Sequence, residues 1–268
     1  MNFIDFVRAH GLIVRDIDVG RWVRVPTVDH PHSKNGAYKF MGDVGFVQNW
    51  AEQTEVVVWK PEKDYVIDPK VVLKAKTFDA ELNRGRVQAA EKAIWIINQT
   101  LQARHDYLDA KGFKDGTGLV WYKDQRQTLV IPMRAAGNVV GCQLIDEEGN
   151  KKFLKGQRTN DATFTFGTGD PILCEGYATG LSVHAAVTAL RARKSVVVCF
   201  SAGNLSRIAK ALNGVVIVAD NDASGTGEKV AQGYKFWMSD TVGEDFNDYH
   251  RRVGLFQAAQ ALRKFLNG

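Results

Sequence analysis

Two apolar runs in the C-terminal half of this chain end in carboxylates. The run 172–174 is followed by Glu175, and the run 215–219 is followed by Asp220 and Asp222. An apolar run of this length that precedes a helical pattern is typical of a buried parallel strand. Open α/β sheets carry their chemistry at the carboxyl ends of such strands. We therefore expect these three carboxylates at one edge of a sheet.

A third acidic segment, 244–248, contains Asp245. Acidic residues also cap helices and stabilise turns, so one such cluster indicates no more than a turn. Three clusters in one sheet favour a metal site instead. Carboxylate oxygens are hard ligands that suit Mg²⁺ or Mn²⁺. Zinc is not expected, because Cys142, Cys174 and Cys199 are the only cysteines and lie far apart in the sequence.

The composition is that of an ordinary folded protein. The chain has 268 residues, of which 45% are hydrophobic and 24% charged, and this is enough for one large domain or two small ones. The net charge of +5 is compatible with a polyanionic partner but does not require one. No apolar stretch approaches the roughly 20 residues of a membrane helix, and the N-terminus does not resemble a signal peptide. We expect a cytoplasmic protein without a membrane partner.

The order of patterns along the chain predicts four segments. They are a β-rich N-terminal module over 1–68, a helical linker over 69–117 with a helix at 81–104, a hairpin-rich basic subdomain over 118–170, and an α/β domain with C-terminal helices over 171–268. In the last segment strands and helices alternate, which predicts a parallel sheet with right-handed crossovers.

Two further features of the sequence admit a structural explanation. The segment 224–229 is not a phosphate-binding loop, because Glu228 separates the last glycine from the lysine; Thr226 is better interpreted as a helix cap. The aromatic residues of the N-terminal module either form its core or stack on single-stranded bases. They are Trp22, Tyr38, Phe40, Trp50 and Trp59.

Three motifs resemble those of the TOPRIM domain shared by primases and topoisomerases, and most of all the primase-like proteins of phages and plasmids. They are Glu175-Gly176 after one strand, the segment 200–204 after the next, and the segment 219–222 after the third. The resemblance covers roughly residues 118–250. It implies an α/β fold in which a TOPRIM-type parallel sheet, flanked by helices, follows a hairpin-rich subdomain and a small β-rich module.

The resemblance also implies roles for individual residues. Glu175 would act in acid–base chemistry or metal binding and, with Asp220 and Asp222, form the catalytic set. The same three residues and Asp245, from the segment that resembles the family's third motif, Asp-x-Asn-Asp, would bind Mg²⁺. The residues implied to contact nucleic acid or nucleotides are Lys151, Lys152, Lys155, Arg158 and Asn204. A run of cations is, however, also common on a solvated surface.

The function implied by the resemblance is that of a DNA primase in phage or plasmid replication. Such an enzyme is a Mg-dependent nucleotidyltransferase that joins ribonucleoside triphosphates on a single-stranded DNA template. A replicative helicase would be a separate partner, and the cysteine-free module over 1–68 is a candidate for template binding. Two alternatives remain open: a TOPRIM metal-dependent nuclease, and a non-catalytic replication factor that binds single-stranded DNA.

Overall fold

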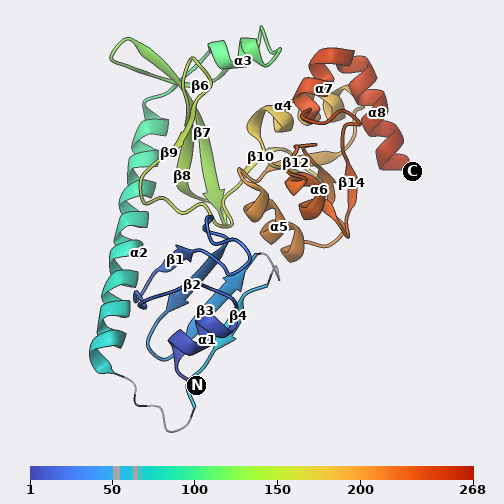
Figure 1. The fold of residues 1–268 in the computed structure, drawn as a ribbon. Coiled ribbons are helices and arrows are strands. Elements are labelled where there is room, and N and C mark those ends of the chain that lie inside the picture. Colours follow the sequence, from blue (N-terminus) through green and yellow to red (C-terminus); the bar gives the residue numbers. More distant parts are fainter. Residues whose placement is uncertain (51–54, 63–65, 67) are drawn as a thin grey trace. The chain divides into compact units, whose positions relative to one another are not determined.

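The computed structural model describes residues 1–50, 55–62, 66 and 68–268 (Figure 1). The chain divides into two compact units, Met1–Gly85 and Arg86–Gly268. The expected β-rich module over 1–68 falls in the first unit, apart from 51–54, 63–65 and 67, which lie outside the described residues.

The first unit contains a four-stranded antiparallel sheet in the order β1-β2-β3-β4. Its elements are α1 (Phe3–Ala9), β1 (Trp22–Val25), β2 (Gly36–Phe40), β3 (Gly45–Asn49) and β4 (Val57–Trp59). Helix α1 packs Phe3 against the sheet, where its ring is stacked on Phe40 with centroids 4.7 Å apart. The small β-rich module expected from the sequence is therefore present.

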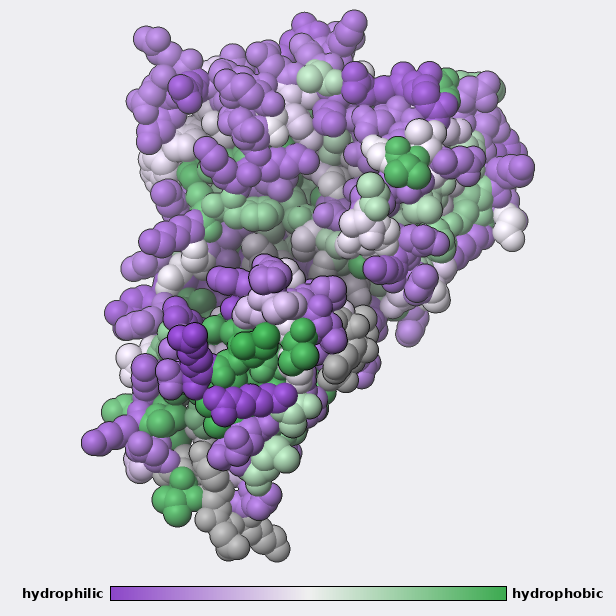
Figure 2. Space-filling view, in the orientation of Figure 1, coloured by the Kyte–Doolittle hydropathy of each residue, from purple (hydrophilic) through white to green (hydrophobic). Residues whose placement is uncertain are grey.

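The aromatic residues of this unit divide between core and surface. Tyr38, Phe40 and Trp59 are buried in the core, so they cannot stack on bases. Trp22 and Trp50 are exposed, at 47% and 37%. The Arg24 guanidinium covers one face of Trp50 at 4.1 Å from the ring centroid. Figure 2 shows hydrophobic residues, in green, on the surface of this unit among hydrophilic ones.

Helix α2 (Pro69–Asn98) is longer and begins earlier than the helix expected over 81–104. Its start has an ordinary signal: Asp68 accepts a hydrogen bond from the N–H of Lys70 at 2.8 Å, and Pro69 is the first helical residue. At its other end the helix stops at Asn98, and β5 (Leu101–Ala103) follows. The boundary between the two units falls within α2, after Gly85.

The second unit begins with the C-terminal part of α2 and an antiparallel sheet in the order β5-β6-β7-β8-β9. Its further elements are α3 (Asp106–Ala110), β6 (Gly118–Lys123), β7 (Arg126–Ala135), β8 (Asn138–Ile145) and β9 (Lys151–Phe153). Ala93 and Ile96 of α2 pack on one face of this sheet against Val130 and Cys142. This is the hairpin-rich subdomain expected from the sequence.

The second sheet of this unit has the order β10-β12-β11-β13-β14. Its strands are β10 (Phe164–Gly167), β11 (Asp170–Cys174), β12 (Lys194–Val198), β13 (Val216–Val218) and β14 (Lys235–Trp237). β11, β12 and β13 are parallel, as predicted, and β14 pairs parallel with β13, whereas β10 pairs antiparallel with β12. The edge strands β10 and β14 were not anticipated as members of this sheet.

Helices cover both faces of the mixed sheet. They are α4 (Tyr177–Ala189), α5 (Ala202–Ala211), α6 (Thr226–Ala231), α7 (Phe246–Val253) and α8 (Leu255–Asn267). One core contains α4, α7 and α8 together with residues of the antiparallel sheet. The other contains α5 and α6. The fold is thus α/β, as expected, and among the described residues no helix is long and apolar enough to cross a membrane.

Gly180 allows α4 to pack closely on the sheet. A Cβ at this position would lie 2.5 Å from Cγ2 of Val198 and 3.3 Å from Phe166. We expect Gly180→Ala to lower the free energy of unfolding by about 1–3 kcal/mol, because the buried neighbours have little room to move. Urea unfolding of the full chain measures this.

Gly203 in α5 provides the matched control, because a Cβ there would meet nothing within 4 Å. Gly203→Ala should leave stability unchanged or raise it by up to about 1 kcal/mol. Equal destabilisation by both substitutions would contradict the close-packing explanation for Gly180.

Candidate active site

Three carboxylates meet at the carboxyl end of the parallel strands. Glu175 follows β11, Asp220 follows β13, and Asp245 immediately precedes α7. They line one cavity of about 210 Å³. The other residues that line it are Lys111, Gln143, Lys151, Gly176, Tyr177, Ala178, Thr179 and Phe200. Three of the four predicted metal ligands are therefore brought together.

Of the three carboxylates, Asp220 lies where its charged form is most disfavoured. Its Oδ1 is buried and has no hydrogen-bond partner. Burial, followed by the nearby charges of Asp245 and Glu175, raises the pKa of Asp220 to about 7. An unpartnered buried carboxylate oxygen is costly unless a proton or a cation compensates it.

Glu175 is held at the edge of the sheet by its backbone. Its carbonyl accepts a hydrogen bond from the N–H of Phe200 at 2.8 Å, and its side chain accepts one from the N–H of Ala202. Burial is the main cause that raises the pKa of Glu175, and the charge of Asp222 adds to it. Phe200 has φ of 67°, a conformation that non-glycine residues rarely adopt. This tight turn brings the Phe200 side chain to the cavity.

Asp222 stabilises a turn instead of lining the cavity. Its Oδ2 accepts a hydrogen bond from the N–H of Gly227 at 2.9 Å, and its Oδ1 accepts one from the N–H of Ser224 at 2.9 Å. The hydrogen bond from the Ser224 hydroxyl, followed by that from Gly227, lowers the pKa of Asp222 to about 2. Asp222 thus caps a backbone N–H group at the start of α6 from the preceding turn, although the N-cap residue of this helix is Gly225. Thr226 is the first residue of the helix, so the expectation that it is the cap was wrong.

Two residues of the third acidic segment contribute to the cavity: Asp245 lines it, and Asn247 holds a segment that borders it. Asp245 caps α7 by accepting a hydrogen bond from the N–H of Asp248 at 2.8 Å. Asn247 is fully buried, and its amide donates to the carbonyl of Lys111 and the hydroxyl of Ser182, both at 2.9 Å. Asn247 therefore fixes the segment that carries Lys111.

Two lysines face the carboxylates. Lys151 begins β9, and its Nζ lies 5.9 Å from the ring centroid of Tyr107. Desolvation, followed by the charge of Lys111, lowers the pKa of Lys151, while the carboxylates act in the opposite direction. Sequence reasoning found Lys151 but missed Lys111, Gln143 and Phe200. Nothing local distinguishes Lys111, which lies in the segment expected to be a linker.

The other predicted nucleic-acid contacts lie outside this cavity. Lys152 and Lys155 are exposed, and Arg158 forms an ion pair with Asp161. Asn204 is buried, and its amide donates to the carbonyls of Ala162 and Cys199 at 2.8 Å. Its side chain is thus occupied by backbone groups, which corrects its expected role in binding nucleotides.

The donor set suits a hard divalent cation. Carboxylate oxygens are the ligands that Mg²⁺ and Mn²⁺ prefer, and Asp220 Oδ1 is a buried oxygen in need of a partner. In the part of the chain that the structure describes, no three acidic, histidine or cysteine side chains are already arranged as a metal centre. Binding of a cation would therefore require Glu175, Asp220 and Asp245 to adjust their side chains.

Comparison with protein families identifies the domain that carries this site. Residues 170–255 match the Toprim domain family. This segment is a Toprim domain. It runs from β11 to the first residue of α8 and contains Glu175, Asp220 and Asp245. The resemblance noted in the sequence is confirmed.

Two relatives of the chain are named DNA primase TraC. A DNA primase TraC from Escherichia coli is 30% identical over 189 residues, which cover 62% of this chain and 13% of that protein. A second DNA primase TraC from the same species is 27% identical over 253 residues, covering 82% and 23%. The chain thus spans less than a quarter of the length of either relative.

Primase domains also occur among similar solved structures. Bacteriophage T7 primase domains, in a structure with the lagging-strand DNA polymerase, are 16% identical to this chain with a TM-score of 0.43. The match covers 60% of this chain and 85% of that one.

The raised pKa of Asp220 predicts a gain in stability for Asp220→Asn in the absence of divalent cations. An acid whose pKa is higher in the native state makes folding less favourable as pH rises from roughly 4 to 7, and the full penalty persists above 7. At pH 8 we expect a gain of about 1–2 kcal/mol that disappears below about pH 4. Thermal unfolding of both proteins across this pH range measures the gain. A difference in stability that does not change with pH would contradict the raised pKa of Asp220.

Asp222→Ala should have the opposite effect, because it removes the cap of α6. The expected loss is about 1 kcal/mol, and Asp222→Asn should recover part of it. Urea unfolding compares both with Asp240→Ala, an exposed carboxylate in the same domain. If Asp222→Ala and Asp240→Ala were equally stable, the capping role would be disproved.

Proposed function

We propose that this chain is the catalytic core of a DNA primase, which makes RNA primers on single-stranded DNA with Mg²⁺. The observation that carries the proposal is the cavity in which Glu175, Asp220 and Asp245 face Lys111 and Lys151. It lies on a Toprim domain in a chain that is similar to DNA primase TraC over 82% of its length.

The chemistry required is phosphoryl transfer, in which a protein mainly positions groups and neutralises charge. Glu175, Asp220 and Asp245 would hold the Mg²⁺, which, when bound, neutralises phosphate oxygens and favours the attacking alkoxide. Lys151 and Lys111 bind the phosphates of the incoming nucleotide. Glu175 accepts the proton of the attacking hydroxyl or shares in holding the cation.

The proposed partners are single-stranded DNA, ribonucleoside triphosphates and a replicative helicase. Lys152, Lys155 and Arg158 follow Lys151 in the same basic segment, outside the cavity. In the proposal they contact backbone phosphates of the template, which binds without base-specific contacts there. In this proposal the two lysines of the cavity bind nucleotide phosphates, and the cations outside the cavity bind the DNA strand.

Glu175→Gln tests the reaction, because it keeps the shape of the side chain and removes its charge. With labelled ribonucleotides, single-stranded DNA and Mg²⁺ or Mn²⁺, we expect primer synthesis to fall at least about 10²-fold. Binding of single-stranded DNA, measured by fluorescence anisotropy, should stay close to that of the unmodified chain. Glu228→Gln, an exposed residue of the same domain, is the control and should leave synthesis unchanged.

The same assay decides between the alternatives. If the unmodified chain makes no primers but cuts DNA in a metal-dependent manner, the nuclease function replaces the primase. Tight binding of DNA without either reaction would favour a non-catalytic replication factor. Loss of both synthesis and DNA binding in Glu175→Gln would indicate that Glu175 has a structural role.

A further inference from the structure

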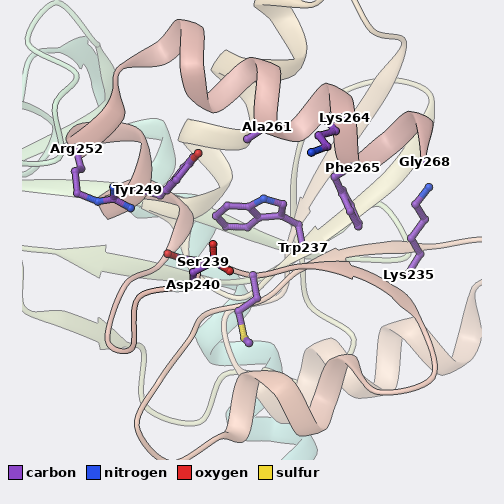
Figure 3. Close-up of a pocket in the computed structure, with 11 residues that line it drawn as sticks. Lys235, Trp237, Ser239, Asp240, Tyr249, Arg252, Ala261, Lys264, Phe265 and Gly268 are labelled. Carbon is purple, nitrogen blue, oxygen red and sulfur yellow. The ribbon is translucent and has the colours of Figure 1, made fainter.

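A second cavity, of about 530 Å³, lies in the C-terminal part of the second unit. It is formed by β14, α7 and α8 and the residues that follow β14 (Figure 3). Its volume falls in the range of roughly 300–1,000 Å³ that is usual for small-molecule sites.

Three aromatic rings from three different elements face this cavity. Trp237 lies between Tyr249 and Phe265 (Figure 3), and each of the three side chains is half-buried. The rings of Trp237 and Tyr249 are 5.1 Å apart at 61°. Because they meet edge to face, they do not cover one another as stacked rings would. A planar ligand can therefore make a stacking contact that Trp237 and Tyr249 do not make with each other. The third ring, Phe265, has the Lys235 Nζ 5.5 Å from its centroid.

Cations lie at both ends of the row of aromatic rings (Figure 3). At one end Arg252 is held by two hydrogen bonds to Glu244, of 2.7 and 2.9 Å, and lies 5.2 Å from the Tyr249 ring centroid. At the other end are Lys235 and Lys264. Lys235 donates to the carbonyl of Leu266 at 3.1 Å.

The charges of the cavity leave an excess of cations. Glu244 is neutralised by Arg252, and Asp240 is the acidic side chain that lines the cavity. Lys264 is exposed and has no ion-pair partner among the described residues. Among the side chains that line the cavity, Lys235 and Lys264 are therefore opposed by one carboxylate, that of Asp240, which favours an anionic group at their end.

We propose that this cavity binds a nucleotide, either free or as part of a single strand. The base stacks on the rings of Trp237 and Phe265, and the phosphate contacts Lys264 and Lys235. Aromatic faces beside cations are the combination by which proteins bind single-stranded bases without sequence preference. The proposal concerns a site distinct from the carboxylate cavity and holds whether or not that cavity makes primers.

The cavity is connected to the loop that carries Asp220. Asn221 donates from its side chain to the carbonyl of Ser239 at 2.9 Å, and its own carbonyl accepts from the N–H of Gly243 at 2.6 Å. A nucleotide bound here would thus lie against the segment 239–243, which bonds to the loop that carries Asp220. This position suits either an effector nucleotide or the strand that enters or leaves the carboxylate cavity.

Photocrosslinking to the full chain tests the site without relying on activity. The probes are 8-azido-ATP and an oligonucleotide that contains 4-thiothymidine, and the labelled peptides are identified by mass spectrometry. We expect label on the peptides that contain Trp237 or Phe265. Lys264→Glu should reduce this label about tenfold, as should Phe265→Ala through loss of stacking. Arg263→Glu, an exposed neighbour on α8 outside the cavity, is the matched control and should leave it unchanged.

The two probes distinguish the source of the nucleotide. Label from 8-azido-ATP supports a free nucleotide, and label from the oligonucleotide alone supports a strand. Label confined to peptides of the carboxylate cavity would overturn the proposal. It would also be overturned if Lys264→Glu and Arg263→Glu reduced the label equally, or if neither did. Since Lys264 is exposed, its substitution remains informative even if Phe265→Ala fails to fold.

Discussion

The burial of neighbouring carboxylates at the ends of β11 and β13 is the constraint on which the charge balance of the second unit depends. Glu175, Asp220 and Asp245 share one cavity, and the pKa of Asp220 is raised because burial and its neighbours disfavour its charge. The fold limits this cost with Lys151, which comes from the antiparallel sheet. The charge balance of the Toprim domain therefore requires a residue from outside that domain.

The hydrophobic core explains how Lys151 reaches the carboxylates. One continuous cluster includes Leu129 and Ile145 of the antiparallel sheet together with Val198 and Phe246 of the Toprim domain. Because buried side chains are close-packed, the two sheets are held in a defined position within this unit. Asn247 adds a polar connection by binding the carbonyl of Lys111. The positions of Lys111 and Lys151 thus depend on contacts made by residues that are distant from them in the sequence.

Local patterns in the sequence were sufficient to predict the parallel strands β11, β12 and β13 and the positions of Glu175 and Asp220 after two of them. They could not separate Asp220 from Asp222, because an aspartate that lines a cavity and one that caps backbone N–H groups look alike after a strand. The burial of Asn204 and the contribution of Lys111 depend on contacts between distant segments, which periodicity does not report. The early start of α2 is different, because the pair Asp68-Pro69 is a local signal for a helix start in the sequence.

The three consecutive residues Asp220, Asn221 and Asp222 have three different roles. Asp220 faces the carboxylate cavity, Asp222 caps α6, and Asn221 between them binds the segment that contains Ser239 and Gly243. Each task fixes the backbone of the same short loop from another direction. A displacement of the segment after β14 must therefore be accommodated by the loop that carries Asp220. Through this connection, a ligand in the cavity lined by Trp237, Tyr249 and Phe265 can affect the position of Asp220 in the carboxylate cavity without touching a ligand bound there.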